Sequence, residues 1–177
     1  MTIIEVLKIQ HNVILRQLEY LEKLKGSAQR DSGPCCLKQV LLCIVDTVDA
    51  HAKIEEKYLF PELEPYVGKE MSSPAVMKFE HAEILGILAA LRKTDAVEAV
   101  LLETAKFIVF LRDHIAKEEK VLFPTAEKAL GQKRLEELLQ KSGVFQRKNA
   151  GYRGGGHCLE VEKQTPEDDF RNPRERP

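Results

Sequence analysis

Residues 51–64 read His51-Ala-Lys-Ile-Glu-Glu-Lys-Tyr-Leu-Phe-Pro-Glu-Leu-Glu. A similar stretch, residues 114–127, reads His114-Ile-Ala-Lys-Glu-Glu-Lys-Val-Leu-Phe-Pro-Thr-Ala-Glu, and the fold prediction starts from this repeat. Eight of the fourteen positions are identical, among them His, Glu-Glu-Lys and Leu-Phe-Pro. An earlier pair of segments also matches, because His11-Asn-Val-Ile-Leu-Arg-Gln-Leu resembles His81-Ala-Glu-Ile-Leu-Gly-Ile-Leu. One half of the chain therefore looks like a copy of the other, and we expect the copies to pack with approximate two-fold symmetry.

Four segments carry the spacing of apolar residues that is typical of helices, and none shows the alternation typical of strands. They cover about residues 3–25, 34–61, 73–93 and 95–128. Thr2 and Glu5 form a capping-box pattern before the first segment, and Asp95 with Glu98 marks the start of the fourth. Gly131 breaks the chain, and residues 132–141 then add a short fifth helix. Short connections between long amphipathic helices predict an all-α fold, an antiparallel up-down-up-down four-helix bundle over residues 1–145.

Composition and charge limit the classes of function. Of the 177 residues, 44% are hydrophobic and 31% are charged, which suits a globular domain, and no run of about 18 apolar residues indicates a membrane span. Twenty-seven basic and 28 acidic residues leave a net charge of −1, so no global field favours nucleic acid. Residues 146–177 have few apolar anchors and many breakers, which predicts a flexible tail. The N-terminus shows no signal-peptide pattern, and we expect a cytoplasmic protein.

Each predicted helix carries one apolar stripe that a histidine interrupts. The stripes are, in chain order, Ile4, Leu7, His11, Ile14, Leu18 and Leu21, then Leu37, Leu41, Ile44, Val48, His51 and Glu55, then Met77, His81, Ile84, Leu88 and Leu91, and finally Val97, Val100, Thr104, Phe107, Leu111, His114, Glu118 and Val121. In two of them a glutamate follows the histidine by four residues, which puts both side chains on one helix face. These polar groups are therefore expected to point at the core.

The six polar groups are also expected to lie at one depth in the bundle. At 1.5 Å of rise per residue, His11 and His81 lie about 10 to 12 Å from the starts of their helices, and Glu55 and Glu118 lie about 9 to 15 Å from the ends of theirs. In an antiparallel bundle those ends lie together. Because a buried, unpaired carboxylate costs several kcal/mol, the groups need partners. Buried His–Glu pairs, or pairs on the surface, are the alternative without metal, but two matched copies and two further histidines favour a metal site.

The type and number of these groups narrow the choice of metal. Four imidazoles and two carboxylates include no thiolate and are too many for one tetrahedral zinc, whereas magnesium and calcium prefer more oxygen ligands. The set suits iron or manganese, most naturally a pair of ions bridged by the two glutamates. Two six-coordinate ions offer about twelve positions. The protein ligands and one oxo or hydroxo bridge fill about ten of them, which leaves about two for water or a small diatomic ligand.

The order His…His-x-x-x-Glu…His…His-x-x-x-Glu, with Glu-Glu-Lys and Leu-Phe-Pro in each half, resembles the hemerythrin-like (HHE cation-binding) family over about residues 3–130. The resemblance implies a bundle that holds a non-haem di-iron centre. It implies terminal histidine ligands and bridging carboxylates, which match His11, His51, His81, His114, Glu55 and Glu118. The oxygen-carrying members have a further histidine one turn after the first histidine of the third helix. This chain has Leu85 there, a departure that favours redox chemistry or labile iron over reversible dioxygen carriage.

The leading prediction is therefore a di-iron protein that binds or senses dioxygen, nitric oxide or redox state. The alternative is an iron-handling protein that donates or buffers iron for the repair of iron–sulfur centres, and a third interpretation is a metal-free helical interaction module. A binding protein or sensor is favoured over an enzyme. Signalling or iron delivery would require a protein partner, since no output domain is recognised in the sequence.

Structural roles are expected for several other residues. Glu56 and Glu119 lie off the stripes, so we expect them on a solvated face with the neighbouring lysines, and Tyr58 at the boundary of the bundle. Cys36 and Cys43 are expected to be small buried apolar side chains. The pair His157-Cys158 lies in the predicted tail, where a second metal site is disfavoured.

Overall fold

The computed structural model describes residues 1–28, 34–67 and 73–144. Within these ranges the chain is helical and contains no strand, which confirms the all-α class. The elements are α1 (Ile3–Ala28), α2 (Pro34–Ile54), the π-helix η1 (Glu55–Leu59), α3 (Phe60–Val67), α4 (Ser73–Arg92), α5 (Val97–Lys117), the π-helix η2 (Glu118–Leu122) and α6 (Phe123–Ser142). The predicted tail, residues 146–177 with His157 and Cys158, lies outside the described residues.

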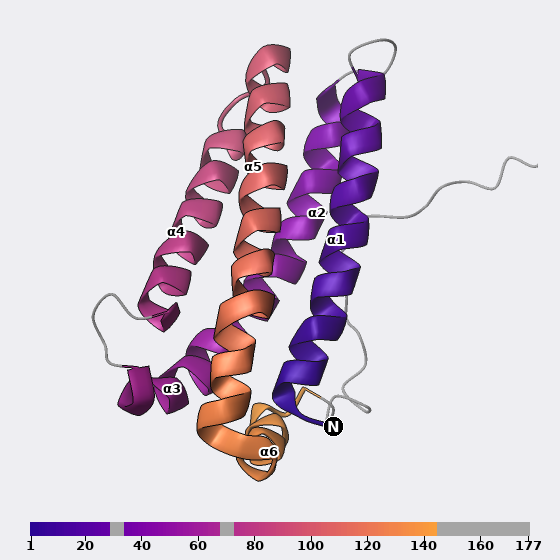
Figure 1. Cartoon of the computed structure of the whole chain (residues 1–177). Helices are drawn as coiled ribbons and strands as arrows, with labels where there is room; N and C mark the ends of the chain where they lie inside the picture. The colour runs from indigo at the N-terminus through magenta and orange to yellow at the C-terminus, as the bar shows by residue number, and fades with distance from the viewer. Residues whose placement is uncertain (29–33, 68–72, 145–177) are drawn as a thin grey trace, which may run out of the picture.

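Helices α1, α2, α4 and α5 lie side by side, and the short α3 and the kinked α6 gather at the end where the N-terminus lies (Figure 1). Helix α1 packs against α2 and α5, and α4 packs against α5. Two ion pairs give the direction of α1 relative to the last helices. Lys8 Nζ lies 3.2 Å from Glu127 Oε1, whereas Glu22 Oε1, further along α1, lies 2.9 Å from the earlier Arg112. These two parts of the chain therefore run antiparallel.

The interior consists of two apolar cores, one above the other along the bundle. The upper core contains Ile14, Leu41, Leu88, Phe107 and their neighbours on α1, α2, α4 and α5. The lower core joins the first turns of α1 to the segments after the π-helices, with Leu7, Phe60, Met77, Phe123 and Leu135 among its members. All predicted stripe residues are buried in these cores or between them except two, because Val97 is 39% exposed and Val121 is 54% exposed.

The π-helices explain the error at Val121. In η2 the Phe123 N–H donates to Glu118 O, five residues back, so the turn contains one residue more than an α-helical turn. The stripe consequently passes from Glu118 to Leu122, which is fully buried, rather than to Val121. In η1 the Phe60 N–H donates to Glu55 O in the same way. The repeated Glu-Glu-Lys-x-Leu sequence is therefore a repeated wide turn.

The predicted end of the second segment at residue 61 was also wrong, because the chain continues as helix α3 to Val67. Pro61 lacks an N–H and is tolerated near the start of a helix, so directly after the wide turn it begins a new helical segment instead of ending one. The capping box is confirmed, since Thr2 N donates to Glu5 Oε2 at 2.7 Å and Glu5 N donates to Thr2 Oγ1 at 3.2 Å.

Two other helix boundaries differ in detail from the prediction. Helix α5 begins at Val97 rather than Asp95, and this late start leaves Val97 in its exposed first turn. Helix α6 covers both the end of the predicted fourth segment and the predicted fifth helix. Inside it Gly131 adopts φ 70° and ψ 165°, a non-helical conformation that suits glycine and marks a kink.

The prediction that Cys43 is buried was wrong, because its side chain is exposed. On α2 the buried positions are Leu41 and Ile44, and Cys43 is rotated away from that face by about 100° relative to its neighbour Ile44. The side chain of Cys36 lies outside the described residues.

Phe107 lies at the centre of the upper core with no exposed surface. We expect Phe107→Ala to lower the free energy of unfolding by about 3–5 kcal/mol, since it leaves a cavity among packed side chains. Val109 on the same helix is 62% exposed, so Val109→Ala is the matched control and should change stability by less than about 0.5 kcal/mol. Urea unfolding followed by circular dichroism measures both, and equal effects would contradict the assigned core.

Candidate metal centre

A layer of polar side chains separates the two apolar cores. On every long helix the layer falls between residues of the lower core and residues of the upper core, as His11 does between Leu7 and Ile14. The six residues predicted as ligands are all buried here, with residue exposures of 0–4%: His11, His51, Glu55, His81, His114 and Glu118. The structure therefore brings the complete predicted set into one layer.

The first pair of imidazoles, from α1 and α2, meets around both glutamates. His11 Nε2 lies 3.0 Å from His51 Nε2 and 3.0 Å from Glu118 Oε2. His51 Nε2 lies 3.5 Å from Glu55 Oε1. In this group each of the four residues offers one ligand atom, and these atoms all lie within 4.8 Å of one another. We call this group the His11–His51 position.

The second pair, from α4 and α5, approaches the other oxygens of the same glutamates. His81 Nε2 lies 3.4 Å from Glu55 Oε2, and His114 Nε2 lies 3.1 Å from Glu118 Oε1. The ligand atoms of this second group, the His81–His114 position, again lie within 4.8 Å of one another. Each glutamate thus presents one oxygen to one pair of histidines and its second oxygen to the other pair.

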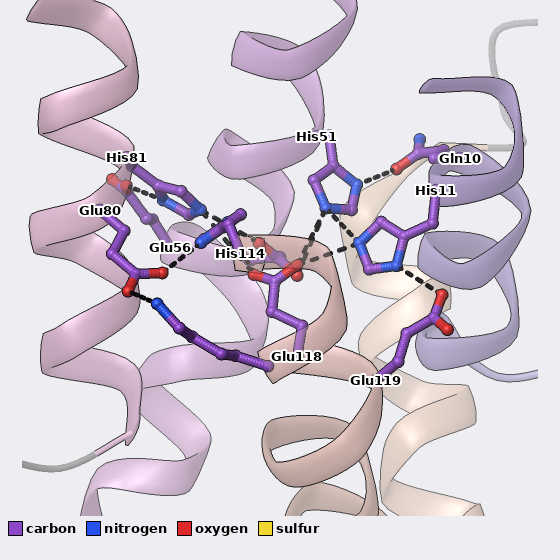
Figure 2. A network of polar contacts seen from close by, with 11 residues as sticks. Gln10, His11, His51, Glu56, Glu80, His81, His114, Glu118 and Glu119 are labelled. Carbon is purple, nitrogen blue, oxygen red and sulfur yellow. Dashed lines mark hydrogen bonds and ion pairs between the residues drawn. The ribbon is translucent and has the colours of Figure 1, made fainter. Parts of the chain in front are cut away.

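The outer nitrogen of every imidazole has its own acceptor (Figure 2). The distances from Nδ1 to the acceptor oxygen are 3.0 Å for His11 to Glu119, 2.9 Å for His51 to Gln10, 2.7 Å for His81 to Glu56, and 2.8 Å for His114 to Glu80. Because these oxygens accept, Nδ1 of a neutral imidazole is the donor, and the lone pair stays on Nε2. All four Nε2 atoms therefore face the layer in the tautomer that binds metal.

The phenylalanine of each Leu-Phe-Pro repeat packs on a histidine of the opposite half. Phe123 stacks on His11 with ring centroids 5.3 Å apart, and Phe60 stacks on His81 at 5.9 Å. Both interplanar angles are 16°. The extra residue in each π-helix directs these rings inward, so the wide turns form the apolar floor of the layer.

Sequence reasoning missed the residues that hold the outer nitrogens. Glu56 and Glu119 were expected on a solvated face, but each accepts a hydrogen bond from a buried histidine while 42% of its side chain stays exposed. Gln10 and Glu80 were not singled out at all. The internal repeat contains a signal for these four residues. Gln10 and Glu80 each directly precede the first histidine of their half, and Glu56 and Glu119 each directly follow the buried glutamate of their half. Tyr58 is half-buried and packs against the lower core, as expected.

The pKa values of the two central carboxyl groups, those of Glu55 and Glu118, shift in opposite directions. Burial and the charge of Glu118 raise the pKa of Glu55 well above its usual value. Burial acts in the same direction on Glu118, but the imidazoles of His11, His114 and His51 that face it outweigh burial and hold the pKa of Glu118 well below its usual value. The side chains alone therefore favour one neutral and one ionised carboxyl group.

The imidazoles also differ in pKa. Burial lowers the pKa of His51 to about 4 and also lowers that of His81. Burial would lower the pKa of His114 too, but the nearby carboxyl group of Glu118 and the hydrogen bond and charge of Glu80 outweigh it and raise that pKa. At neutral pH the His51 and His81 imidazoles are thus neutral, which is the protonation state of a metal ligand.

The donor set fits a pair of cations. Both oxygens of Glu55, both of Glu118 and Nε2 of His81 are buried without a hydrogen bond that satisfies them. Nε2 of His11 and Nε2 of His51 face each other at 3.0 Å, where two lone pairs need a proton or a cation between them. Ligand atoms that are about 2.1 Å from one cation and at right angles lie about 3 Å apart. Cations at the two positions would satisfy all of these atoms.

One side of the layer reaches a cavity of about 190 Å³ between α2, η1 and α4. Its lining includes His81, Glu56, Val48, Ile84 and Leu85. Leu85, which is 45% exposed, stands one turn after His81. The cavity gives a small molecule a largely apolar route to the His81 side of the layer.

Comparison with known proteins found one family. The family model described as the hemerythrin HHE cation binding domain matches residues 2–126, which include all six predicted ligands. No curated protein and no solved structure matches the chain significantly. Among the described residues, no helix is long and apolar enough to cross a membrane.

The unsatisfied carboxyl group of Glu55 should cost folding stability. We expect Glu55→Leu, a change of similar volume, to raise the unfolding free energy of the chelator-treated protein by about 1–3 kcal/mol, because it removes a buried polar group without a partner. Exposed Glu83 provides the control, and Glu83→Leu should change stability by less than about 0.5 kcal/mol. A loss of stability in Glu55→Leu, measured by thermal and urea unfolding, would contradict this reading of the layer.

Proposed function

Because this chain belongs to the hemerythrin HHE cation-binding domain family, we propose that it binds two iron ions in the polar layer. The observation that carries the proposal is the convergence of four Nε2 atoms on two buried glutamates that face both histidine pairs. His11 and His51 would hold one ion, His81 and His114 would hold the other, and Glu55 and Glu118, which face both pairs of histidines, would be shared by both ions. When bound, such a pair supplies exchangeable coordination positions and one-electron redox chemistry.

The protein's own groups prepare the layer for this role. Hydrogen bonds at Nδ1 fix the tautomer and the orientation of each ring, so that the ligand atoms need little rearrangement. Phe60 and Phe123 close the layer toward the lower core, and Ile14 and its neighbours close it toward the upper core. The cavity beside His81 gives one route from the surface to the layer.

The proposal includes the complete predicted architecture. We infer that residues 1–145 form an up-down-up-down bundle, with residues 132–141 as a fifth helix after the kink at Gly131, and that the protein works in the cytoplasm. The antiparallel pairing of α1 with the last helices supports this arrangement.

The ligand of the centre is proposed to be a small diatomic molecule. The cavity next to His81 is small, and its lining is largely apolar, which favours dioxygen or nitric oxide over a charged metabolite. The role is that of a binding protein or sensor of dioxygen, nitric oxide or redox state.

Anaerobic iron loading tests the metal site. The protein, treated with excess ferrous iron and desalted, should retain two ions per chain and develop a ligand-to-metal charge-transfer band in air. Loading at about 100 times the dissociation constant should add about 2.7 kcal/mol to its unfolding free energy for each ion bound. His114→Ala should lose at least one ion and much of this gain, whereas the neighbouring control Asp113→Ala, exposed on α5, should lose neither. If iron stabilises neither protein, the chain is a metal-free helical module instead.

A second candidate, an iron donor, is favoured by Leu85 at the exposed rim of the cavity, because the side chain one turn after His81 cannot act as a ligand. A donor should transfer iron to an apo iron–sulfur acceptor faster than the same concentration of free ferrous ion does. Leu85→His should slow the transfer by supplying an additional ligand. The rate of cluster formation, followed by its visible absorption, measures both, and transfer no faster than from free iron would exclude this candidate.

A further inference from the structure

The two halves of the layer differ at one pair of equivalent residues. In the second half, Glu80 accepts from His114 Nδ1 at 2.8 Å and also pairs closely with Lys117. In the first half, Gln10 takes the place of Glu80 and accepts a hydrogen bond from His51 Nδ1 at 2.9 Å. The residue three positions after the histidine also differs, because it is Ile54 in the first half and Lys117 in the second. A charged pair behind one histidine is thus replaced by a neutral pair behind the other.

We propose that this difference makes the two metal positions unequal, so that the His81–His114 position binds its ion first and more tightly. Glu80 is the positioning residue that produces the difference by acting through His114. The inference rests on the proposed function, since it requires that the layer bind metal, and it assigns an order of occupation to the two positions.

The remaining outer contacts are balanced, which isolates the effect of Glu80. Glu56 and Glu119 each hold a histidine of the opposite half, at 2.7 Å and 3.0 Å, and both side chains are 42% exposed. Both positions share Glu55 and Glu118, and each has one stacked phenylalanine. In the outer contacts, only Gln10 against Glu80, with Ile54 against Lys117, breaks the symmetry.

A carboxylate behind a histidine strengthens that histidine as a ligand. The anionic acceptor pulls on the Nδ1 proton and raises the electron density at Nε2, whereas a neutral amide does so weakly. Glu80 is only 6% exposed, so water screens its charge little. Lys117 shares the carboxylate, but its side chain is 51% exposed, and solvent weakens its counter-charge. Loss of such an outer partner typically costs about 10–100-fold in metal affinity.

Titration of the full chain with ferrous iron under anaerobic conditions, in competition with a chromophoric chelator, tests the inference. The unmodified protein should bind two ions in separate steps. Glu80→Gln should weaken the tighter step about 10–100-fold and bring the two steps together. Gln10→Glu should strengthen the weaker step by about 10-fold or more, a gain that structural damage does not produce. Glu83→Gln, on the exposed face of α4, is the control and should change neither step.

Gln10→Glu should remain folded, since Gln10 lines a cavity of about 650 Å³ in which the new charge stays hydrated. Circular dichroism melting before metal addition checks this. One-ion variants assign the positions, because His51→Ala should retain its ion more tightly than His114→Ala does.

Two equal steps in the unmodified protein, or no effect of Glu80→Gln on the tighter step, would overturn the inference and leave the proposed function intact. Failure to bind any iron would overturn both. If Gln10→Glu weakens binding in a folded protein, the assigned role of the carboxylate is wrong.

Discussion

The rest of this structure depends on one constraint, which is that two carboxyl groups are enclosed between two apolar cores and need partners there. Neither Glu55 nor Glu118 has any exposed surface, and their four oxygens lack satisfying hydrogen bonds. Side chains reduce the cost only in part, by keeping one carboxyl group neutral and pairing the other with histidines. Bound cations would give these oxygens the partners that they lack. The polar layer therefore lowers the free energy of unfolding, and the burial of the two apolar cores must offset this cost.

The two halves of the repeat complete each other. Glu56 and Phe60 from the first half hold His81 in the second, and Glu119 and Phe123 from the second half hold His11 in the first. Among the outer contacts of the four imidazoles, only those of Gln10 and Glu80 remain within one half. A single half would thus leave its first histidine without an outer acceptor and without an aromatic neighbour. The orientation of the imidazoles is a property of the assembled bundle, and it is lost if the halves separate.

The residues of the layer could be predicted from the sequence because two periodicities coincide there. The helical period placed six polar groups on buried stripes, and the internal repeat placed them at one depth. Val121 was misassigned because a stripe extrapolated with the α-helical period ignores the extra residue of η2. Glu56 and Glu119 are exposed as predicted, but their hydrogen bonds to histidines were missed because glutamates beside lysines resemble an ordinary solvated face. Their contacts cross from one half to the other, and no local pattern reports on a contact between halves.

The wide turns η1 and η2 also have a consequence for changes in chain length. A residue inserted into a continuous helix rotates everything beyond it by about 100°, which would turn one core outward relative to the other. Here the extra residue is already present at the same level in both halves, so the upper and lower cores keep separate phases. Deletion of Lys57 or Lys120 would remove the extra residue from one π-helix only. The helix beyond it would then be rotated relative to the equivalent helix of the other half. Insertions and deletions at this level are therefore tolerable only as a matched pair.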